Sequence, residues 1–335
     1  MKKFKNALPS RKVKNYLTKH GMVKWLNILI VFIIMGCSQK ETNLPESGSK
    51  AKTADKEWLK KDVVKIAAAQ VNRDENKYDV MLGYIDSAGA EGADLIILPE
   101  YIAGTFSLPL KATDPVNQIA EAARRNWIYV IVGGWEEFEK GAVAAKKAGA
   151  FSNTALLFDR NGEVMGRYCK MHAAVGKAPH WWPPLPDQSE WIMKAGEEFP
   201  VFELDFGRVG IMTCYDGYFP EPADILSLHG AEIVAWINGR RGSIEPYLVQ
   251  SDMFRNYIAM VATNLGQGAG TMIATHPNII LEHVDDTGNH YISAEINLKS
   301  LRERRANSRV HHQRRPELYG SITKSHEIWK VYEDQ

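Results

Sequence analysis

Three side chains stand at the ends of apolar segments and together could carry out nucleophilic catalysis. Glu100, Lys170 and Cys214 each follow a run of residues that is typical of a strand. A carboxylate can accept a thiol proton, and a fixed ammonium can stabilise the thiolate and the oxyanion formed on attack. Taken singly, each charge is more often a solvated strand end, and the cysteine more often a small buried apolar residue. Their combination predicts a cysteine nucleophile with a base and a cation.

The residues around Cys214 predict a strand-to-helix turn. The apolar run 209–213 leads into the cysteine, and Pro220 with Glu221 is typical of a helix start. A helix N-terminus directed at the sulfur favours the thiolate, which is the reactive form. We therefore expect this environment to favour a Cys214 thiolate.

Strands and helices that could position these residues alternate along the chain from Asp62 onward. A helical stripe is expected at 79–90. Strands are expected at 63–71, 93–100, 127–132, 162–170, 209–213, 233–237, 259–263 and 290–296. Such alternation favours an α/β fold, and residues 61–335 are numerous enough to form one large domain.

Three separated segments resemble motifs of the nitrilase superfamily of carbon–nitrogen hydrolases. They are LPEYIAGTF at 98–106, GRYCKMH at 166–172 and GIMTCYDGYFPE at 210–221. The resemblance extends from about Val63 through Tyr319, which is most of the chain. It implies a four-layer α-β-β-α sandwich, homodimers that pack through helical faces, and a Glu-Lys-Cys catalytic triad.

The resemblance also implies a mechanism. Glu100 would take the Cys214 proton, and the thiolate would attack a carbonyl or nitrile carbon. Lys170 and the backbone N–H of Tyr215 would hold the negative charge of the oxyanion. Water would then release the acid from an acyl thioester. Many family members have a second, supporting glutamate near the nucleophile, and Glu190 is the candidate here.

Departures from the family pattern bear on the substrate. Tyr215 and Asp216 follow the cysteine where nitrilases proper usually have Trp-Glu, which favours a small linear amide or N-carbamoyl amine over a nitrile. The D-type carbamoyl-amino-acid hydrolases have an arginine pair just after this aspartate. Gly217 and Tyr218 occupy those positions here, which argues against that binding mode.

Substrate-binding candidates lie in two loops and beside the lysine. Asn238 and Arg240 follow a predicted strand, and Arg240 with Arg241 could clamp a carboxylate or could be solvated. Trp182 lies in a proline-rich loop and could line the pocket or serve packing or a dimer contact. His172 shares the face of Lys170 if the strand continues, which would place it near the substrate.

The N-terminus resembles a bacterial lipoprotein signal. An apolar run at 25–35 is too short to cross a bilayer, and Ile34-Met35-Gly36-Cys37 resembles a lipobox. Residues 1–36 are therefore interpreted as a signal peptide, and 37–60 as a lipidated Cys37 with a solvated tether. An ordinary cleaved signal is the alternative, and Met22 is a second possible start. A lipid anchor would place the protein in the cell envelope, on a bacterial membrane. Ser38 rather than Asp after Cys37 favours the outer membrane in a bacterium with two membranes.

Charge and cysteine content exclude several other classes. Removal of residues 1–36 leaves 33 basic and 40 acidic residues, a formal balance of −7, which argues against nucleic-acid binding. Three cysteines, with Cys169 expected to be a buried inert thiol, imply no disulfide framework. No HxxxH or CxxC spacing predicts a metal site, and no cofactor is expected.

Three functions remain open at this point. The first is a lipid-anchored amidohydrolase that acts on a small linear amide or N-carbamoyl amine. The second is an acyltransferase of the same superfamily, in which an amine replaces water. The third is a surface binding protein without catalysis, which the presence of Glu100, Lys170 and Cys214 disfavours.

Overall fold

The computed structural model describes residues 61–174, 189–328 and 330. The expected signal peptide and tether at 1–60, including Cys37, and the candidate Trp182 lie outside the described residues. Within the described part, no helix is both long enough and apolar enough to cross a membrane.

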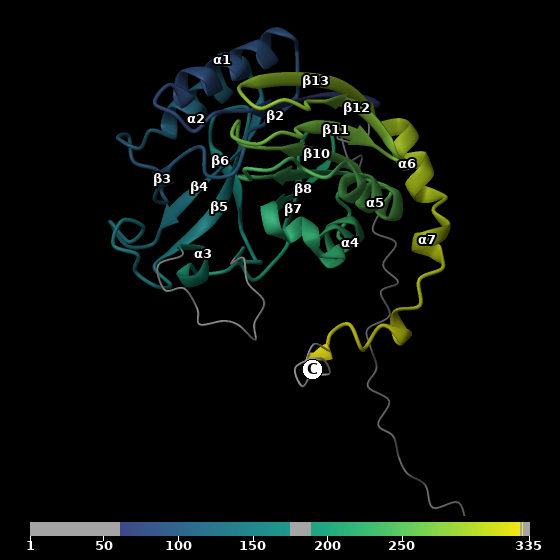
Figure 1. Ribbon diagram of the computed structural model, residues 1–335. Helices are drawn as coiled ribbons and strands as arrows, with labels where there is room; N and C mark the ends of the chain where they lie inside the picture. The colour runs from purple at the N-terminus through teal and green to yellow at the C-terminus, as the bar shows by residue number, and fades with distance from the viewer. Residues whose placement is uncertain (1–60, 175–188, 329, 331–335) are drawn as a thin grey trace, which may run out of the picture. The chain divides into compact units, whose positions relative to one another are not determined.

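Two mixed sheets form the centre of the domain (Figure 1). The first has the strand order β13-β1-β2-β4-β5-β6, and β3 pairs with β4 at its side. Its strands are β1 Val63–Gln70, β2 Leu95–Ile97, β3 Thr105–Phe106, β4 Tyr129–Glu137, β5 Phe151–Phe158, β6 Val164–Cys169 and β13 His290–Asn297. β1, β2 and β4 run parallel, whereas β5 is antiparallel to both β4 and β6. β6 therefore runs in the same direction as β2.

The second sheet has the strand order β12-β11-β10-β9-β8-β7. Its strands are β7 Val201–Glu203, β8 Arg208–Thr213, β9 Ile233–Ile237, β10 Ala259–Thr263, β11 Met272–Thr275 and β12 Ile279–His283. β8, β9 and β10 are parallel and pair without a register shift. Their carboxyl ends therefore share one edge, which is where parallel sheets commonly carry functional residues.

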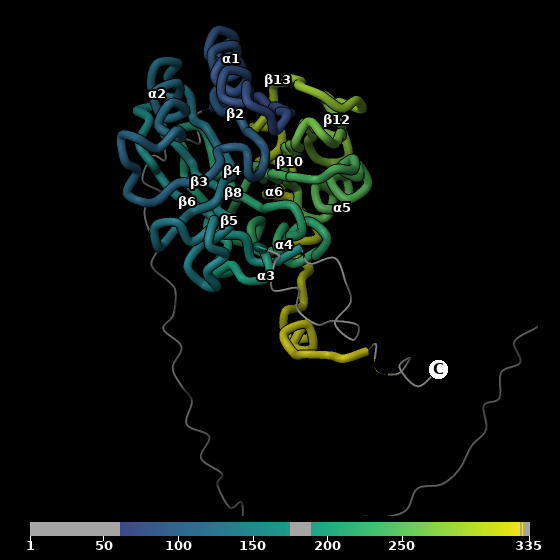
Figure 2. The backbone as a smooth tube through the Cα atoms, turned by 60° about the vertical axis from the view of Figure 1, so that its left-hand side comes forward, coloured from purple at the N-terminus to yellow at the C-terminus, as the bar shows by residue number. Residues whose placement is uncertain are grey.

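Helices cover the outer face of each sheet, so the fold is the α-β-β-α sandwich (Figures 1 and 2). α1 Lys77–Ala90 and α2 Asn117–Asn126 pack on the first sheet, and α4 Pro220–Leu228 and α5 Pro246–Asn256 pack on the second. The remaining helices are the short α3 Ser189–Ile192, then α6 Leu298–Ala306 and α7 Arg309–His312 near the C-terminus.

The core follows the two-residue period of the strands. In β1, Ile66 belongs to the cluster that also contains Ile211 and Val261 of the second sheet. The next residue, Ala67, belongs to the cluster that contains Ile85 of α1. Because successive side chains of a strand point to opposite faces, one strand fills both apolar layers. This is why central strands such as β2 and β9 are apolar throughout rather than alternating.

The expected strands hold their positions, but three of them end earlier than the sequence indicated. β1 ends at Gln70, one residue before the expected end. β2 ends at Ile97, because Pro99 supplies no N–H for a ladder. β6 ends at Cys169, so Lys170 and His172 follow the strand rather than extend it. Glu100 and Lys170 thus both stand just beyond the carboxyl ends of strands in the first sheet.

Candidate active site

A buried ion pair joins the ends of β2 and β6. The Lys170 side chain is completely buried, and its Nζ lies 3.0 Å from Oε1 of Glu100, which is also buried. Charged groups withdrawn from water are stable only when they are paired and hydrogen-bonded. The structure therefore brings together two of the three residues that the sequence singled out.

Glu190 places a second carboxylate on the same ammonium. It lies on the single turn of α3, and its Oε1 is 2.6 Å from Lys170 Nζ. The other oxygen accepts a hydrogen bond of 2.5 Å from the backbone N–H of Ala174. Lys170 is thus held between two carboxylates from different parts of the chain, one beyond the end of β2 and one on α3.

Two further residues of this cluster, Tyr101 and Asn153, were not among the sequence candidates. The Asn153 amide donates to Oε1 of Glu100 at 2.7 Å and to Oε1 of Glu190 at 3.1 Å. The Tyr101 hydroxyl donates to Glu190. A signal for Asn153 was present, because Ser-Asn-Thr at 152–154 is a polar stretch in a strand that is buried throughout.

One oxygen of Glu100 is left without a hydrogen bond. Oε1 accepts from Lys170 and Asn153, whereas Oε2 is buried and has no partner among the described residues. An unpaired buried carboxylate oxygen is costly, by about 1–3 kcal/mol or more for a charged group. It is also the atom of Glu100 that is free to accept a proton.

The pKa values of the cluster reflect burial and mutual charge. Burial raises the pKa of Glu100, and the neighbouring Lys170 only partly offsets this. Burial alone would lower the pKa of Lys170, but the charges of Glu100 and Glu190 outweigh it and raise that pKa. Lys170 is therefore held as a cation, and the raised pKa makes the Glu100 carboxylate a stronger base than an ordinary glutamate, which suits a general base.

Cys214 begins a 3-10 helix, Cys214–Tyr218, and has a left-handed backbone with φ of 46°. Burial raises the pKa of its thiol to about 12, and the negative charge of Glu100 adds to the increase while Lys170 opposes it. This environment favours the thiol over the resting thiolate that the sequence suggested. Helix α4 starts at Pro220, as expected. The neutral thiol needs a base when substrate is attacked.

Asp216 connects the turn at Cys214 to the residues on either side of Lys170. Its Oδ2 accepts from the backbone N–H of Thr213 at 2.9 Å and from the Tyr168 hydroxyl at 2.6 Å. Its Oδ1 accepts from the backbone N–H of His172 at 3.1 Å and lies 2.8 Å from Nδ1 of that ring. Tyr168 and His172 stand two residues before and two residues after Lys170. One buried carboxylate therefore holds both sides of Lys170 beside Cys214.

His172 has protein partners on both sides of its ring. Besides the contact with Asp216, it stacks on Phe219 with ring centroids 4.1 Å apart. The ring is about one-third exposed, at 32%. This geometry braces the cysteine turn, and a contact between His172 and substrate stays a prediction.

Asn238 and Arg240 lie beyond the end of β9 and approach the same site. Asn238 is fully buried, donates to the Trp236 carbonyl at 2.9 Å, and accepts from Nε of Arg240 at 3.0 Å. The Trp236 indole N–H in turn donates to the Cys214 carbonyl at 2.9 Å. Arg241, by contrast, is exposed. Tyr215 is the second residue of the 3-10 helix, and the first N–H groups of a helix have no acceptor within it.

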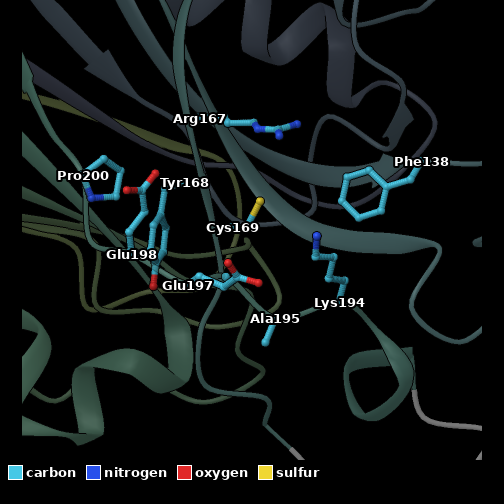
Figure 3. Close-up of a pocket in the computed structure, with 10 residues that line it drawn as sticks. Phe138, Arg167, Tyr168, Cys169, Lys194, Ala195, Glu197, Glu198 and Pro200 are labelled. Carbon is cyan, nitrogen blue, oxygen red and sulfur yellow. The ribbon is translucent and has the colours of Figure 1, made fainter.

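Cys169, the neighbour of Lys170, faces a different environment. It is half-buried rather than buried as expected, and its Sγ lies 3.5 Å from Oγ1 of Thr154. The side chain lines a pocket of about 610 Å³ together with Arg167 and Lys194, as Figure 3 shows. The strand ends with this thiol on the pocket side and sends the next residue, Lys170, into the buried cluster.

Metal binding has no structural support in the described ranges 61–174 and 189–328. No three His, Cys, Asp or Glu side chains gather there as ligands of one ion. The carboxylates of the cluster are instead taken up by an ammonium, an amide and a phenol.

Comparison with known proteins decides the family. Residues 65–306 match the family model described as carbon-nitrogen hydrolase. The chain belongs to this family.

Relatives and solved structures agree with that assignment. Nitrilase homolog 2 of Dictyostelium discoideum is 26% identical over 291 residues, which cover 78% of this chain and 83% of the relative. Omega-amidase NIT2 of Bos taurus is 25% identical over 255 residues, covering 71% and 88%. Citrullinase of Francisella tularensis is 22% identical over 293 residues, covering 78% and 99%.

The carbon-nitrogen hydrolase of Helicobacter pylori G27 has the same fold. Its crystal structure superposes with a TM-score of 0.62 at 17% identity, covering 79% of this chain and 99% of the other. Nit3 of Saccharomyces cerevisiae gives a TM-score of 0.60 at 16% identity, covering 76% and 97%. Both are similar to this chain in their α/β sandwich.

Proposed function

We propose that the protein hydrolyses the carbon–nitrogen bond of a small linear amide or N-carbamoyl amine through a Cys214 thioester. The observation that carries the proposal is that the two carboxylate oxygens of Glu100 have different surroundings. Oε1 is fixed by Lys170 and Asn153, whereas Oε2 is buried and unpaired within the described structure. The relatives named omega-amidase and citrullinase support an amide or ureide substrate.

In the acylation step, Oε2 of Glu100 accepts the thiol proton of Cys214 and the sulfur attacks the carbonyl carbon. The C=O π electrons move to oxygen, and the resulting oxyanion is held by Lys170 and the Tyr215 backbone N–H. When the tetrahedral intermediate collapses, the C–N bond breaks and Glu100 returns its proton to the leaving nitrogen. Ammonia or an amine departs, and the acyl group remains on sulfur.

Deacylation repeats these steps with water. Glu100 accepts a proton from water, the hydroxide attacks the thioester carbon, and the same donors hold the second oxyanion. The C–S bond then breaks, and the thiolate takes the proton back from Glu100. Asn153 and Glu190 act as positioning residues, because Asn153 fixes Glu100 and Glu190 fixes Lys170. Tyr101 acts one step further away, since its hydroxyl donates to Glu190.

The raised thiol pKa supports base-assisted attack rather than a preformed thiolate. A thiol with a pKa of about 12 is almost entirely protonated at neutral pH. A nearby carboxylate with a raised pKa can accept that proton during the attack, when the negative charge passes to the oxyanion beside Lys170.

We also propose that the chain is lipidated on Cys37 in the cell envelope and forms homodimers. The lipobox-like residues 34–37 support the first point, and the family resemblance supports the second. Labelling cells with an alkyne-tagged palmitate and comparing wild type with Cys37→Ser tests lipidation, because only the wild type should carry the label. Light scattering of the purified protein tests the dimer.

The enzyme activity is tested by ammonia release from the full chain, purified in mild detergent. Primary amides, N-carbamoyl amines and nitriles are assayed, with Cys214→Ala in parallel. Release from the first two classes that disappears in the variant is the expected result. Added hydroxylamine should divert the product to a hydroxamate if a thioester forms. Release from nitriles alone, or equal release by Cys214→Ala, would contradict the proposal.

A further inference from the structure

Arg240 spans the two halves of the candidate site. The preceding Gly239 backbone packs on the base, since a Cβ added there would lie 2.9 Å from Oε2 of Glu100 and 2.7 Å from the Tyr101 ring. The Arg240 side chain reaches the other half, where its Nη1 lies 3.2 Å from the hydroxyl of Tyr218, the last residue of the 3-10 helix that begins at Cys214. The guanidinium therefore lies beside the reacting groups.

The guanidinium plane is fixed from several directions. Its carbon lies 4.8 Å from the centroid of the Tyr218 ring and 4.9 Å from that of Trp236. Nε donates to Asn238 at 3.0 Å, and Nη1 also donates to Glu245. Only 10% of the side chain is exposed. A buried arginine held in this way cannot turn its remaining nitrogen toward water without breaking these contacts.

The remaining nitrogen, Nη2, has no acceptor. It is buried and makes no hydrogen bond to any residue in the described part of the chain. A buried donor left unsatisfied costs about 1–3 kcal/mol, and more when it is charged. Its two N–H groups match an oxygen ligand, and an anionic oxygen gives the stronger bond because both partners are charged. The positive charge of Arg240 also acts on Cys214, where it works to lower the pKa of the thiol.

We infer that Nη2 of Arg240 binds a carboxylate of the substrate, located away from the scissile amide. The substrate class is then a linear monoanionic amide, such as the half-amide of a dicarboxylic acid. This inference rests on the proposed function, because it treats Cys214 as the nucleophile.

The existing bond from Arg240 to Glu245 does not oppose a second carboxylate. Glu245 engages Nη1, and the substrate would engage Nη2 on the other branch of the fork. The same protein already holds one cation between two carboxylates, since Lys170 pairs with both Glu100 and Glu190. A carboxylate that joins Arg240 and Glu245 would repeat this arrangement at the substrate end of the site.

The test measures binding to the full chain carrying Cys214→Ala, by calorimetry. The probes are succinamate and glutaramate, each compared with its uncharged counterpart, butyramide or valeramide. We expect at least one half-amide to bind tenfold or more tightly than its counterpart. Adding Arg240→Gln should weaken that half-amide at least tenfold and change the uncharged amide less than threefold.

Two further variants keep the result interpretable. Arg241→Gln removes an equal charge from the neighbouring exposed position and should change every affinity less than twofold. Arg240→Lys keeps the cation but lacks the second nitrogen of the fork, and should weaken the half-amide at least fivefold. Binding of the uncharged amide reports that each variant is folded.

Equal affinity of the Cys214→Ala protein for charged and uncharged amides would overturn the inference, whatever the variants do. An equal loss for both probe types in Arg240→Gln would also overturn it. The proposed function fails in a different way: the half-amide binds through Arg240, yet the protein with Cys214 intact releases no ammonia from any amide.

Discussion

The two cysteines of the described domain stand beside the same lysine in opposite environments. Cys169 directly precedes Lys170 in the chain, ends a regular strand, and opens on a surface pocket with Arg167 and Lys194 (Figure 3). Cys214 comes from the other sheet, has a left-handed backbone, and is half-buried where the charges of Glu100 and Lys170 act on it.

The difference shows that partial exposure alone does not give a thiol catalytic capacity. Both cysteines are half-buried, but the hydrogen-bond partner of Cys169 is the Thr154 hydroxyl rather than a base. Cys214 is harder to ionise, but it has a carboxylate that can take its proton and a cation that can hold the charge produced. The end of β6 separates the two environments, because Cys169 lines the pocket and the next residue, Lys170, is fully buried in the charged cluster.

The largest effect should come from removing the nucleophile. Cys214→Ala should lower kcat/KM by on the order of 10⁴-fold or more, because the covalent route is lost. Ammonia release on the best amide measures this. Activity within tenfold of wild type would mean that Cys214 is not the nucleophile, and the contrast with Cys169 would fail.

Lys170→Met should have the next largest effect and should act on stability as well. It leaves two buried carboxylates without their cation, which costs about 3–5 kcal/mol. The pKa of Cys214 should rise further, because Lys170 opposes its increase. We expect kcat to fall about 10³-fold, as when an oxyanion donor is lost, together with a lower Tm. An unchanged Tm would show that the cluster relaxes without its ammonium.

Glu100→Gln should lower turnover but make the Cys214 thiol easier to ionise. Turnover should fall by about 10²–10⁴-fold through loss of the base. The pKa of Cys214 should drop below about 12, because the negative charge of Glu100 contributes to raising it. Alkylation by iodoacetamide as a function of pH measures the second effect. A Cys169→Ser background removes the second thiol from that assay.

The wild-type pH profile tests the same base. Glu100 must be ionised to accept a proton, so activity should fall as pH decreases through its folded pKa. Because burial raises that pKa, the acid limb should lie above the ordinary glutamate value of about 4.3. The limb should disappear in Glu100→Gln. An acid limb that persists unchanged in the variant would assign it to another group.

Asp216→Asn should have an intermediate effect, since Asp216 positions Lys170 and does not touch the reacting atoms. We expect kcat to fall about 10–100-fold with KM within threefold, as for a small misplacement of catalytic groups. Tyr168→Phe removes only the 2.6 Å bond and should lose less. A rise in KM with kcat unchanged would show that Asp216 shapes substrate binding instead.

Cys169→Ser should have the smallest effect. We expect kcat/KM within twofold of wild type, because Cys169 lines the pocket beside Arg167 and hydrogen-bonds to Thr154 rather than to the charged cluster. A loss above tenfold would contradict the contrast between the two thiols.

The sequence predicted the site through local signals. Glu100, Lys170 and Cys214 were visible because each follows a strand, and strand ends meet at one edge of a sheet. Asn153 and Asp216 were missed because their roles depend on which distant polar atoms they meet after packing. The thiolate expectation has the same limit: the nearby helix start is a local signal, whereas the desolvation and the Glu100 charge that raise the thiol pKa arise only on packing.

The open nitrogen of Arg240 shows this limit most clearly. From the sequence alone, Arg240 could equally bind a carboxylate or be a solvated side chain of a loop. The choice depends on rings of Tyr218 and Trp236 that close over the guanidinium only in the folded chain. No spacing rule predicts which nitrogen of a guanidinium remains without an acceptor.

The four bonds of Asp216 also bear on how the protein folds. They join the end of β8 in one sheet to the end of β6 in the other, so neither sheet can assemble the site alone. Such contacts between distant segments form only after each sheet has gained its own order. Recovery of catalysis after dilution from denaturant should therefore lag behind recovery of circular dichroism, and would time the docking of one sheet on the other.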